Sequence, residues 1–244
     1  MAYTYYKKIS IKADDVNANE SNFPVALEMT DSDLATTANG GHVENTDSNG
    51  GASGSLTVPA DFEVRTDPDD AGTQLDHEVV AYTASSGAIE LWIEIDSLST
   101  GSSPGDDTDI YLCYGDSEVT TSQEDVAGTW GNNFSGVWHF GEASGTLYDS
   151  TSNSNDSSSV TGTITYGATG AIGDALSSGG NAGIDVSDAD ELDPGTGDFT
   201  MAAWFNQSSQ SEPGQFISKR PDLTEGWICY VKNDGALRFF TEGP

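Results

Sequence analysis

Short runs of alternating apolar and polar residues recur along the whole chain, separated by turn-forming stretches rich in Gly, Ser, Asn and Asp. In residues 5–12, YYKKISIK, the pair Ile9 and Ile11 marks the buried side of an opening strand. No segment of about 10–12 residues has the apolar period of roughly 3.6 residues that an amphipathic helix requires. The pattern therefore predicts an all-β protein built from antiparallel sheets.

The first series of strand-like runs ends near residue 116. Turns separate its members about every 8–12 residues, which is typical of a β-sandwich, and we expect one over residues 1–120. The polar, Gly-rich residues 38–55 are expected to form a loop or a hairpin tip. The runs are YYKKISIK (5–12), FPVALEM (23–29), ADFEVRT (60–66), LDHEVVAY (75–82), AIELWIEI (88–95) and TDIYLCYG (108–115).

Residues 121–135 are polar and are expected to connect this sandwich to a second one over residues 136–244. The second sandwich is expected to be jelly-roll-like and incomplete, because the chain stops directly after a strong strand. We therefore expect the sequence to be a portion of something longer. The predicted strands are SGVWHF (135–140), TGTITYG (161–167), GDALSS (173–178), AGIDVS (182–187), FTMAAWFNQ (199–207), GQFISKR (214–220), GWICYVK (226–232) and ALRFFTE (236–242).

Forty Asp and Glu against eight Lys and Arg give the chain a net charge of −32. The carboxylates are spread along the chain instead of forming an acidic tail. Concentrated salt screens the repulsion within such a surface, so the composition favours a halophilic or brine source; an ordinary acidic extracellular protein is the alternative. Nucleic acid and anionic membranes are expected to be poor partners, since little here would neutralise phosphates.

Cys113 and Cys229 lie in apolar strands of different predicted domains, so buried free thiols are expected in preference to a disulfide. The opening MAYTYYKKIS has no apolar core of a signal peptide, and no run is long enough to cross a membrane. If Met1 is the natural start, we expect a protein that stays in the cell or leaves it within an assembly such as a virus particle.

Residues 3–118 resemble an uncharacterised extracellular β-sandwich family that often precedes lectin-like modules. The resemblance is carried by YYKKISI, NFPVAL, DFEVRT, LDHEVVAYTASSGAIELWIEID and IYLCYG, in that order. The second half is similar to concanavalin A-like lectin/glucanase modules of the laminin-G type. That similarity is carried by VWHFGEASGTLYDSTSNSND (137–156), TGAIGDAL, GIDV, DFTMAAWF, ISKR, GWICYV and GALRFF.

The lectin-like resemblance implies that Trp138 and Trp204 belong to core strands and that residues 149–156 lie close to a structural calcium. Ser152 stands where that family has Gly, which weakens the turn. Calcium prefers about six to eight oxygen ligands on a flexible loop. The loop offers four residues as ligands, with a turn rich in Asp and Asn as the alternative. These residues are Asp149, Asn153, Asn155 and Asp156.

The sequence gives little support for catalysis. Glu94 and Asp96 project from one face, as the carboxylates of concanavalin-like glucanases do, but a third carboxylate is missing. We interpret them as the solvated face of a strand whose Leu91, Ile93 and Ile95 are buried. His42, His77 and His139 stand far apart, and the acidic loop 185–198 is expected to be a solvated turn. The chain is therefore not expected to be an enzyme.

Two surface features remain open at this stage. Trp92, Trp130 and Trp227 are candidate platforms for a sugar, although each is more typical of packing. Lys7, Lys8 and Lys12 form a basic trio near the N-terminus. They are expected either to pair with acidic neighbours, in the same protein or in the next subunit, or to protect an edge strand.

Together these features favour a non-catalytic structural or adhesion protein at the surface of a virion. A tail fibre, spike or turret of a virus with a halophilic host, decorating the particle or attaching to host glycans, fits best; this step is an analogy from fold to role. We expect it to form homo-oligomers with other subunits of the assembly. The alternative is a secreted carbohydrate-binding module of a larger extracellular protein or glycosidase.

Overall fold

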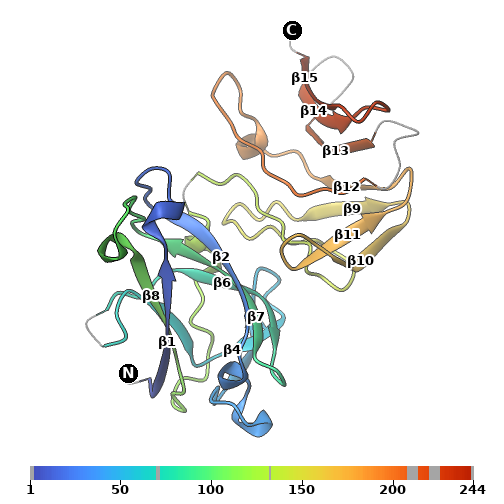
Figure 1. Ribbon diagram of the computed structural model, residues 1–244. Coiled ribbons are helices and arrows are strands. Elements are labelled where there is room, and N and C mark those ends of the chain that lie inside the picture. The colour runs from blue at the N-terminus through green and yellow to red at the C-terminus, as the bar shows by residue number, and fades with distance from the viewer. Residues whose placement is uncertain (1–2, 70–71, 132, 208–213, 220–225, 243–244) are drawn as a thin grey trace. The chain divides into compact units, whose positions relative to one another are not determined.

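The computed structural model describes residues 3–69, 72–131, 133–207, 214–219 and 226–242 (Figure 1). About 41% of the chain is strand and 7% helix, and the sheets are antiparallel, which confirms the predicted all-β class. Two compact units divide the chain, Met1–Gly197 and Asp198–Pro244, and each is described here by itself. None of the helices in the described ranges is long and apolar enough to cross a membrane.

The first unit contains twelve of the strands. They are β1 (Tyr5–Ile11), β2 (Phe23–Thr30), β3 (Thr46–Gly50), β4 (Leu56–Pro59), β5 (Phe62–Arg65), β6 (His77–Thr83), β7 (Ala88–Ile95), β8 (Thr108–Tyr114), β9 (Ser157–Thr161), β10 (Ile164–Thr169), β11 (Asp174–Ser178) and β12 (Gly183–Val186). Its helical elements are α1 (Val126–Thr129) and the 3-10 turns Ala13–Asp15, Ser32–Leu34, Thr37–Asn39, Pro104–Asp106 and Asp190–Leu192.

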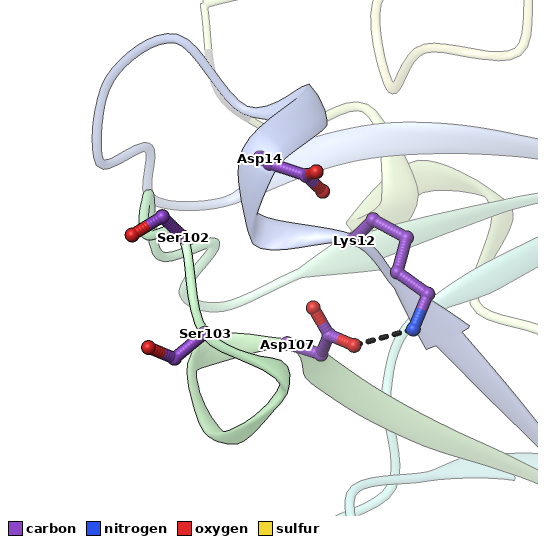
Figure 2. Close-up of a pocket in the computed structure, with 5 residues that line it drawn as sticks. All are labelled: Lys12, Asp14, Ser102, Ser103 and Asp107. Atoms are coloured by element: carbon purple, nitrogen blue, oxygen red, sulfur yellow. Dashed lines mark hydrogen bonds and ion pairs between the residues drawn. The ribbon is translucent and has the colours of Figure 1, made fainter.

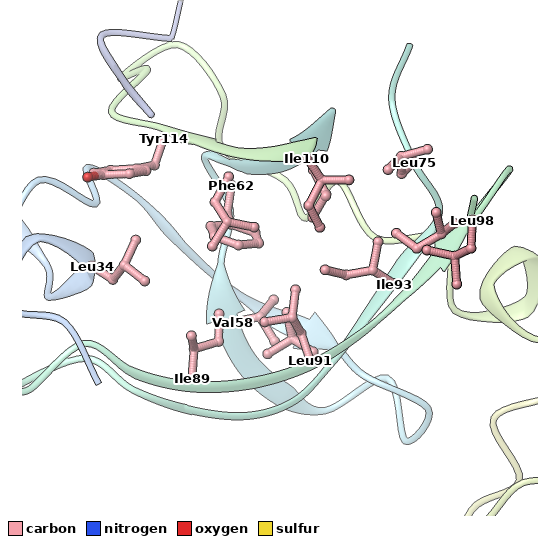
Figure 3. Close-up of a cluster of buried hydrophobic side chains, with 14 residues drawn as sticks. Leu34, Val58, Phe62, Leu75, Ile89, Leu91, Ile93, Leu98, Ile110 and Tyr114 are labelled. Carbon is pink, nitrogen blue, oxygen red and sulfur yellow. The ribbon is translucent and has the colours of Figure 1, made fainter. Parts of the chain in front are cut away.

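Two three-stranded antiparallel sheets, β1-β8-β5 and β2-β7-β6, enclose the main core of this unit. The side chains of Figure 3 point into the space between these sheets. Burial follows the alternation of the sequence: on β7, Leu91 and Ile93 are fully buried, while Trp92 between them faces the other side. The core residues are Leu34, Val58, Phe62, Val64, Leu75, Val79, Ile89, Leu91, Ile93, Ile95, Leu98, Ile110, Leu112 and Tyr114.

The polar residues 38–55 form part of a hairpin, which is one of the two alternatives expected from the sequence. β3 pairs with β4, and the turn between them uses Gly51 and Gly54 at φ of 67° and 60°. Left-handed backbone of this kind favours glycine, because a Cβ would meet the following carbonyl oxygen. The Gly-rich composition therefore reflects a tight turn in this segment.

Residues 121–135 pack against the first sandwich. Trp130 and Thr129, at the end of α1, are 4% and 1% exposed. Glu124 accepts hydrogen bonds from the backbone N–H groups of Val79 and Gly51, at 2.6 and 3.4 Å. The predicted connection is thus a packed part of the first unit. The domain limits at 120 and 136 stay a prediction; the boundary between the compact units falls after Gly197.

Two predicted strands are wrong, and β3, β4 and β9 are absent from the predicted strands. Residues 137–140 form no strand, because the Val137 N–H is bonded to the side chain of Asp149 and Phe140 takes a φ of 61°. Residues 199–207 also lie outside any sheet of the described chain. β9, with the sequence SSSVT, lacks the apolar alternation that reveals a strand; it pairs with β12, and β10 pairs with β11.

The second unit contains one antiparallel sheet, ordered β13-β14-β15. Its strands are β13 (Gly214–Lys219), β14 (Gly226–Val231) and β15 (Leu237–Glu242). Cys229 on β14 is half-buried and Cys113 on β8 is buried, and both are free thiols, as the sequence predicted.

Candidate functional site

The predicted calcium loop, residues 149–156, is held together by the carboxylate of Asp149, which is 5% exposed. Its Oδ1 accepts from the backbone N–H groups of Val137 and Thr151, at 2.9 and 3.0 Å. Its Oδ2 accepts from the Thr151 hydroxyl at 2.8 Å and from the Asn155 N–H at 2.9 Å. Four donors therefore occupy the two oxygens that sequence reasoning offered to a cation.

The other three predicted ligands also take part in hydrogen bonds of this loop. Asp156 Oδ1 accepts from the Asp149 N–H at 2.9 Å. The side-chain amides of Asn153 and Asn155 both donate to the Ser135 carbonyl, at 3.2 and 3.1 Å. The structure thus brings the four predicted residues together as a turn fastened onto the preceding segment.

Calcium at this loop stays a prediction. Among the described residues, no group of three or more His, Cys, Asp or Glu is arranged to hold a metal ion. A cation would compete with N–H and O–H donors for Asp149, whereas side-chain oxygens of Asn153, Asn155 and Asp156 are the groups left to offer.

A second group of interest surrounds a buried carboxylate that the sequence did not single out. We call this carboxylate, Glu78, together with its partners Trp130, His139 and Ser150, the Glu78 node. Glu78 on β6 is 1% exposed. Its Oε2 accepts from the indole N–H of Trp130 at 2.6 Å and lies 3.1 Å from Nε2 of His139. Its Oε1 accepts from the hydroxyl of Ser150 at 2.7 Å. Three donors from one stretch of chain therefore meet on one carboxylate of the sandwich.

These donors belong to one stretch, residues 117–131 and 133–156, which we call the covering segment; its Trp130, His139 and Ser150 contact the outer face of β6. Rings add to the contact: the Trp92 centroid is 5.2 Å from that of Trp130 and 5.7 Å from that of His139. Phe134 meets Trp130 edge-on at 5.1 Å. Tilted and edge-on rings at these distances are favourable packing. Trp92 and Trp130 thus face each other in this contact instead of forming an open platform for a sugar.

A second buried carboxylate, Glu90, lies on the same face of β7 and is 7% exposed. Burial raises its pKa, while the nearby His139 imidazole opposes the increase. Gly173 in the β10–β11 turn packs so closely on this carboxylate that a Cβ there would lie 2.0 Å from Oε2. A Cβ at this position would force the Glu90 side chain to shift, and the φ of 56° also favours glycine.

The arrangement around Glu78 is suited to a structural role. A general base needs a lone pair that a substrate can reach, yet hydrogen-bond donors occupy both oxygens and the group is buried. The alternation of LDHEVVAY placed Glu78 opposite the core, where a carboxylate is normally solvated. The signal that could have revealed the node is the Trp-His pair at 138–139, although Trp138 itself bonds elsewhere, donating to the Asn155 carbonyl at 3.0 Å.

The carboxylates that resemble those of glucanases are only partly solvated. Asp96 is exposed and Glu94 is half-buried, while Leu91, Ile93 and Ile95 are buried as predicted. His42 stacks on Tyr5 at 4.0 Å, and His77 lies inside the core. The three histidines therefore belong to three different environments. That the chain is not an enzyme stays a prediction.

The basic trio pairs with carboxylates of the same protein, which is one of the expected alternatives. Lys7 bridges Asp31 and Asp33 at 2.7 and 2.9 Å. Lys8 pairs with Asp109 at 2.7 Å, and Lys12 with Asp107 at 2.5 Å. Hydrogen bonds to these carboxylates raise the pKa of Lys8 and Lys12. β1 is also the edge strand of its sheet.

A hollow of about 140 Å³ lies at the end of β1. Figure 2 shows the Lys12–Asp107 pair beside Asp14, with Ser102 and Ser103 on the facing loop. It is small, and its one cation is already paired with a carboxylate, so the hollow indicates no particular ligand.

Comparison of the chain with protein-family models, curated proteins and solved structures gave no match. The family resemblances of both halves therefore stay predictions.

Proposed function

We propose that this chain is a non-catalytic structural or adhesion protein, a surface component of a virion such as a tail fibre, spike or turret. In this role it decorates the particle or attaches it to glycans of the host. The observation that carries the proposal is the Glu78 node: the chain uses its buried acid, histidine and indole side chains to fasten a segment onto a sandwich.

Such fastening suits a load-bearing particle component. Glu78 accepts hydrogen bonds from Trp130 and Ser150 of the covering segment, so separating that segment from β6 would break both bonds at once. A hydrogen bond to a charged group contributes about 1.5–3 kcal/mol. A sandwich held in this way resists local opening, as an exposed particle protein must.

The charge supports a high-salt setting for this proposal. Residues 1–197 carry 34 acidic and four basic residues, a net charge of −30. Three of those four cations are the paired Lys7, Lys8 and Lys12. Like charges also act inside: burial and the neighbouring Asp125 and Asp96 raise the pKa of Asp76. Screening by salt relieves this repulsion.

Trp204 supports the alternative of a secreted carbohydrate-binding module. The lectin-like resemblance implied a core strand for this residue, but its side chain is 79% exposed and residues 199–207 form no strand. An exposed indole is the kind of surface on which a sugar ring stacks. The alternative proposal assigns glycan binding to this residue, in a protein without a particle.

The experiment is immunogold electron microscopy of the producing culture, with antibodies raised against residues 1–197. The particle proposal expects gold on the surface of particles that band in a density gradient. Label confined to the particle-free fluid would contradict it. A glycan array in 2 M NaCl, with wild type and Trp204→Ser, then tests the alternative: a bound glycan that the variant loses supports it.

We further propose that a structural calcium, if the loop holds one, binds through Asn153, Asn155 and Asp156. Thermal unfolding with 5 mM calcium and with a chelator tests this: a melting temperature that falls on chelation, and does so less in Asp156→Ala, supports the site. Equal melting temperatures would leave the loop as a turn.

A further inference from the structure

The second unit exposes large apolar side chains, whereas the sandwich of the first unit buries side chains of this kind in its core. Leu237 is 61% exposed, and Phe239 and Phe240 are each 49% exposed. Six of the exposed large apolar side chains among the described residues lie in this unit, which has 47 of the 244 positions. They are Phe199, Trp204, Phe205, Leu237, Phe239 and Phe240. Where exposed apolar side chains lie together, they mark an interaction site.

Four apolar side chains lie together on this sheet, three by strand register and one by ring contacts. Cys229 lies opposite Phe239 and Val231 opposite Leu237, so Trp227, Leu237 and Phe239 share one face of the sheet. Phe199 joins them: its ring centroid is 5.9 Å from that of Trp227 and 6.0 Å from that of Phe239. We call Phe199, Trp227, Leu237 and Phe239 the aromatic face.

The unit that exposes these apolar side chains also carries much less net negative charge than the first unit. Residues 198–244 carry six acidic and four basic residues, a net charge of −2, against −30 for residues 1–197. Among the described strand residues, Lys219, opposite Trp227, is the one charged side chain that the register places on the aromatic face. Among the described strand residues, the register thus places no carboxylate on the aromatic face.

We propose that the aromatic face is where a second copy of this chain docks, face to face, to form a symmetric dimer. Any contact between two copies brings like charges together, and the repulsion is least where both surfaces are nearly neutral. The same surface offers a hydrophobic gain, because Phe199, Leu237 and Phe239 are exposed in the single copy. A twofold arrangement lets one patch serve both partners.

This inference deepens the proposed structural role, because it names the surface through which subunits associate. It also predicts an unusual salt response. Added salt screens the repulsion between the two −30 units and leaves apolar contacts intact, so association tightens as salt rises. A dimer held by ion pairs would weaken instead.

Sedimentation velocity of the whole chain at 0.2 and 2 M NaCl tests the proposal. We expect a reversible dimer whose dissociation constant falls at 2 M. Phe239→Ser should raise that constant about tenfold or more, as truncation of a central interface aromatic does. Phe240→Ser is the matched control: this neighbour has the same exposure but lies on the opposite face, and the dimer should keep its affinity.

Circular dichroism verifies that both variants keep their strands, which their half-exposed positions favour. A monomer at both salt concentrations overturns the proposal and indicates that another protein covers this face. A dimer lost equally in both variants, or in neither, overturns it as well. Immunogold location is read independently, so particle label with a monomeric chain would separate the failure of this inference from the fate of the proposed function.

Discussion

In the first sandwich, Leu91 and Ile93 are fully buried between two sheets, whereas Leu237 on β15 leaves 61% of its side chain exposed. Both regions have the alternation of amphipathic strands. In the first region two sheets pack on each other and many carboxylates lie on the surface. In the second region, among the described residues, no other sheet packs on β13-β14-β15 and carboxylates are few. Apolar alternation therefore predicts a strand, but burial requires a second layer.

The largest expected effect separates the two regions directly. Leu91→Ala removes core methyl groups and leaves a cavity, so the free energy of unfolding should fall by about 2–5 kcal/mol. Leu237→Ala, measured at a chain concentration at which the protein is monomeric, should change it by less than about 0.5 kcal/mol, because that side chain is solvated in the single copy. Urea unfolding of both variants measures this, and equal losses would show that Leu237 is packed as well as Leu91.

Glu78→Ala tests whether the covering segment belongs to the first region. The change strands the indole N–H of Trp130 and the hydroxyl of Ser150, and we expect a loss of about 2–4 kcal/mol. Asp96→Ala, at an exposed carboxylate near the end of the same sheet, is the control and should be almost neutral. Trp130 fluorescence should shift to longer wavelength only in Glu78→Ala; an unchanged spectrum would argue against the node.

His77 makes the first region sensitive to acid. Complete burial lowers its pKa from 6.5 to about 4. Between these values the unfolded chain binds one proton more than the folded chain, so stability is lost as the pH falls below 6.5. From pH 6.5 to 5 the loss should be about 2 kcal/mol. His77→Gln should flatten this part of the stability curve, and an unchanged slope would refute the assignment.

The smallest effect concerns charge. Lys7→Met leaves Asp31 and Asp33 unpaired within a unit of charge −30 and should lower stability by about 1 kcal/mol at low salt. The difference should shrink in 2 M NaCl, since salt screens the added repulsion. Lys232→Met in the nearly neutral unit should show no measurable change at either concentration. A similar salt dependence in both would contradict the charge contrast.

Much of the architecture was readable in the sequence because period-two alternation is local. The runs around Ile9, Leu91 and Leu112 were placed correctly as strands. Residues 137–140 have the same apolar character, yet Asp149 takes the N–H of Val137 and a left-handed Phe140 ends the extended backbone. Such competition between side chain and ladder depends on residues brought from elsewhere, so a local pattern cannot reveal it.

The candidate site divides in the same way. The cluster of Asp149, Asn155 and Asp156 was visible as a loop, because its members are neighbours in the chain. The Glu78 node was not, since its partners Trp130 and Ser150 lie 52 and 72 positions away. Spacing within a motif can suggest a local ligand set, but it carries no information about which distant donors reach a buried acid.

The sequence by itself determined the all-β class, the acidic surface and the near-neutral end, because composition and alternation are properties of the chain. Only the tertiary structure decided which carboxylate is buried, which lysines are paired and which apolar residues remain exposed. The physical reason is that burial depends on which other residues pack against a side chain. Glu78 and Glu94 both lie on antiparallel strands, and it is the covering segment that buries Glu78 and supplies its hydrogen-bond donors.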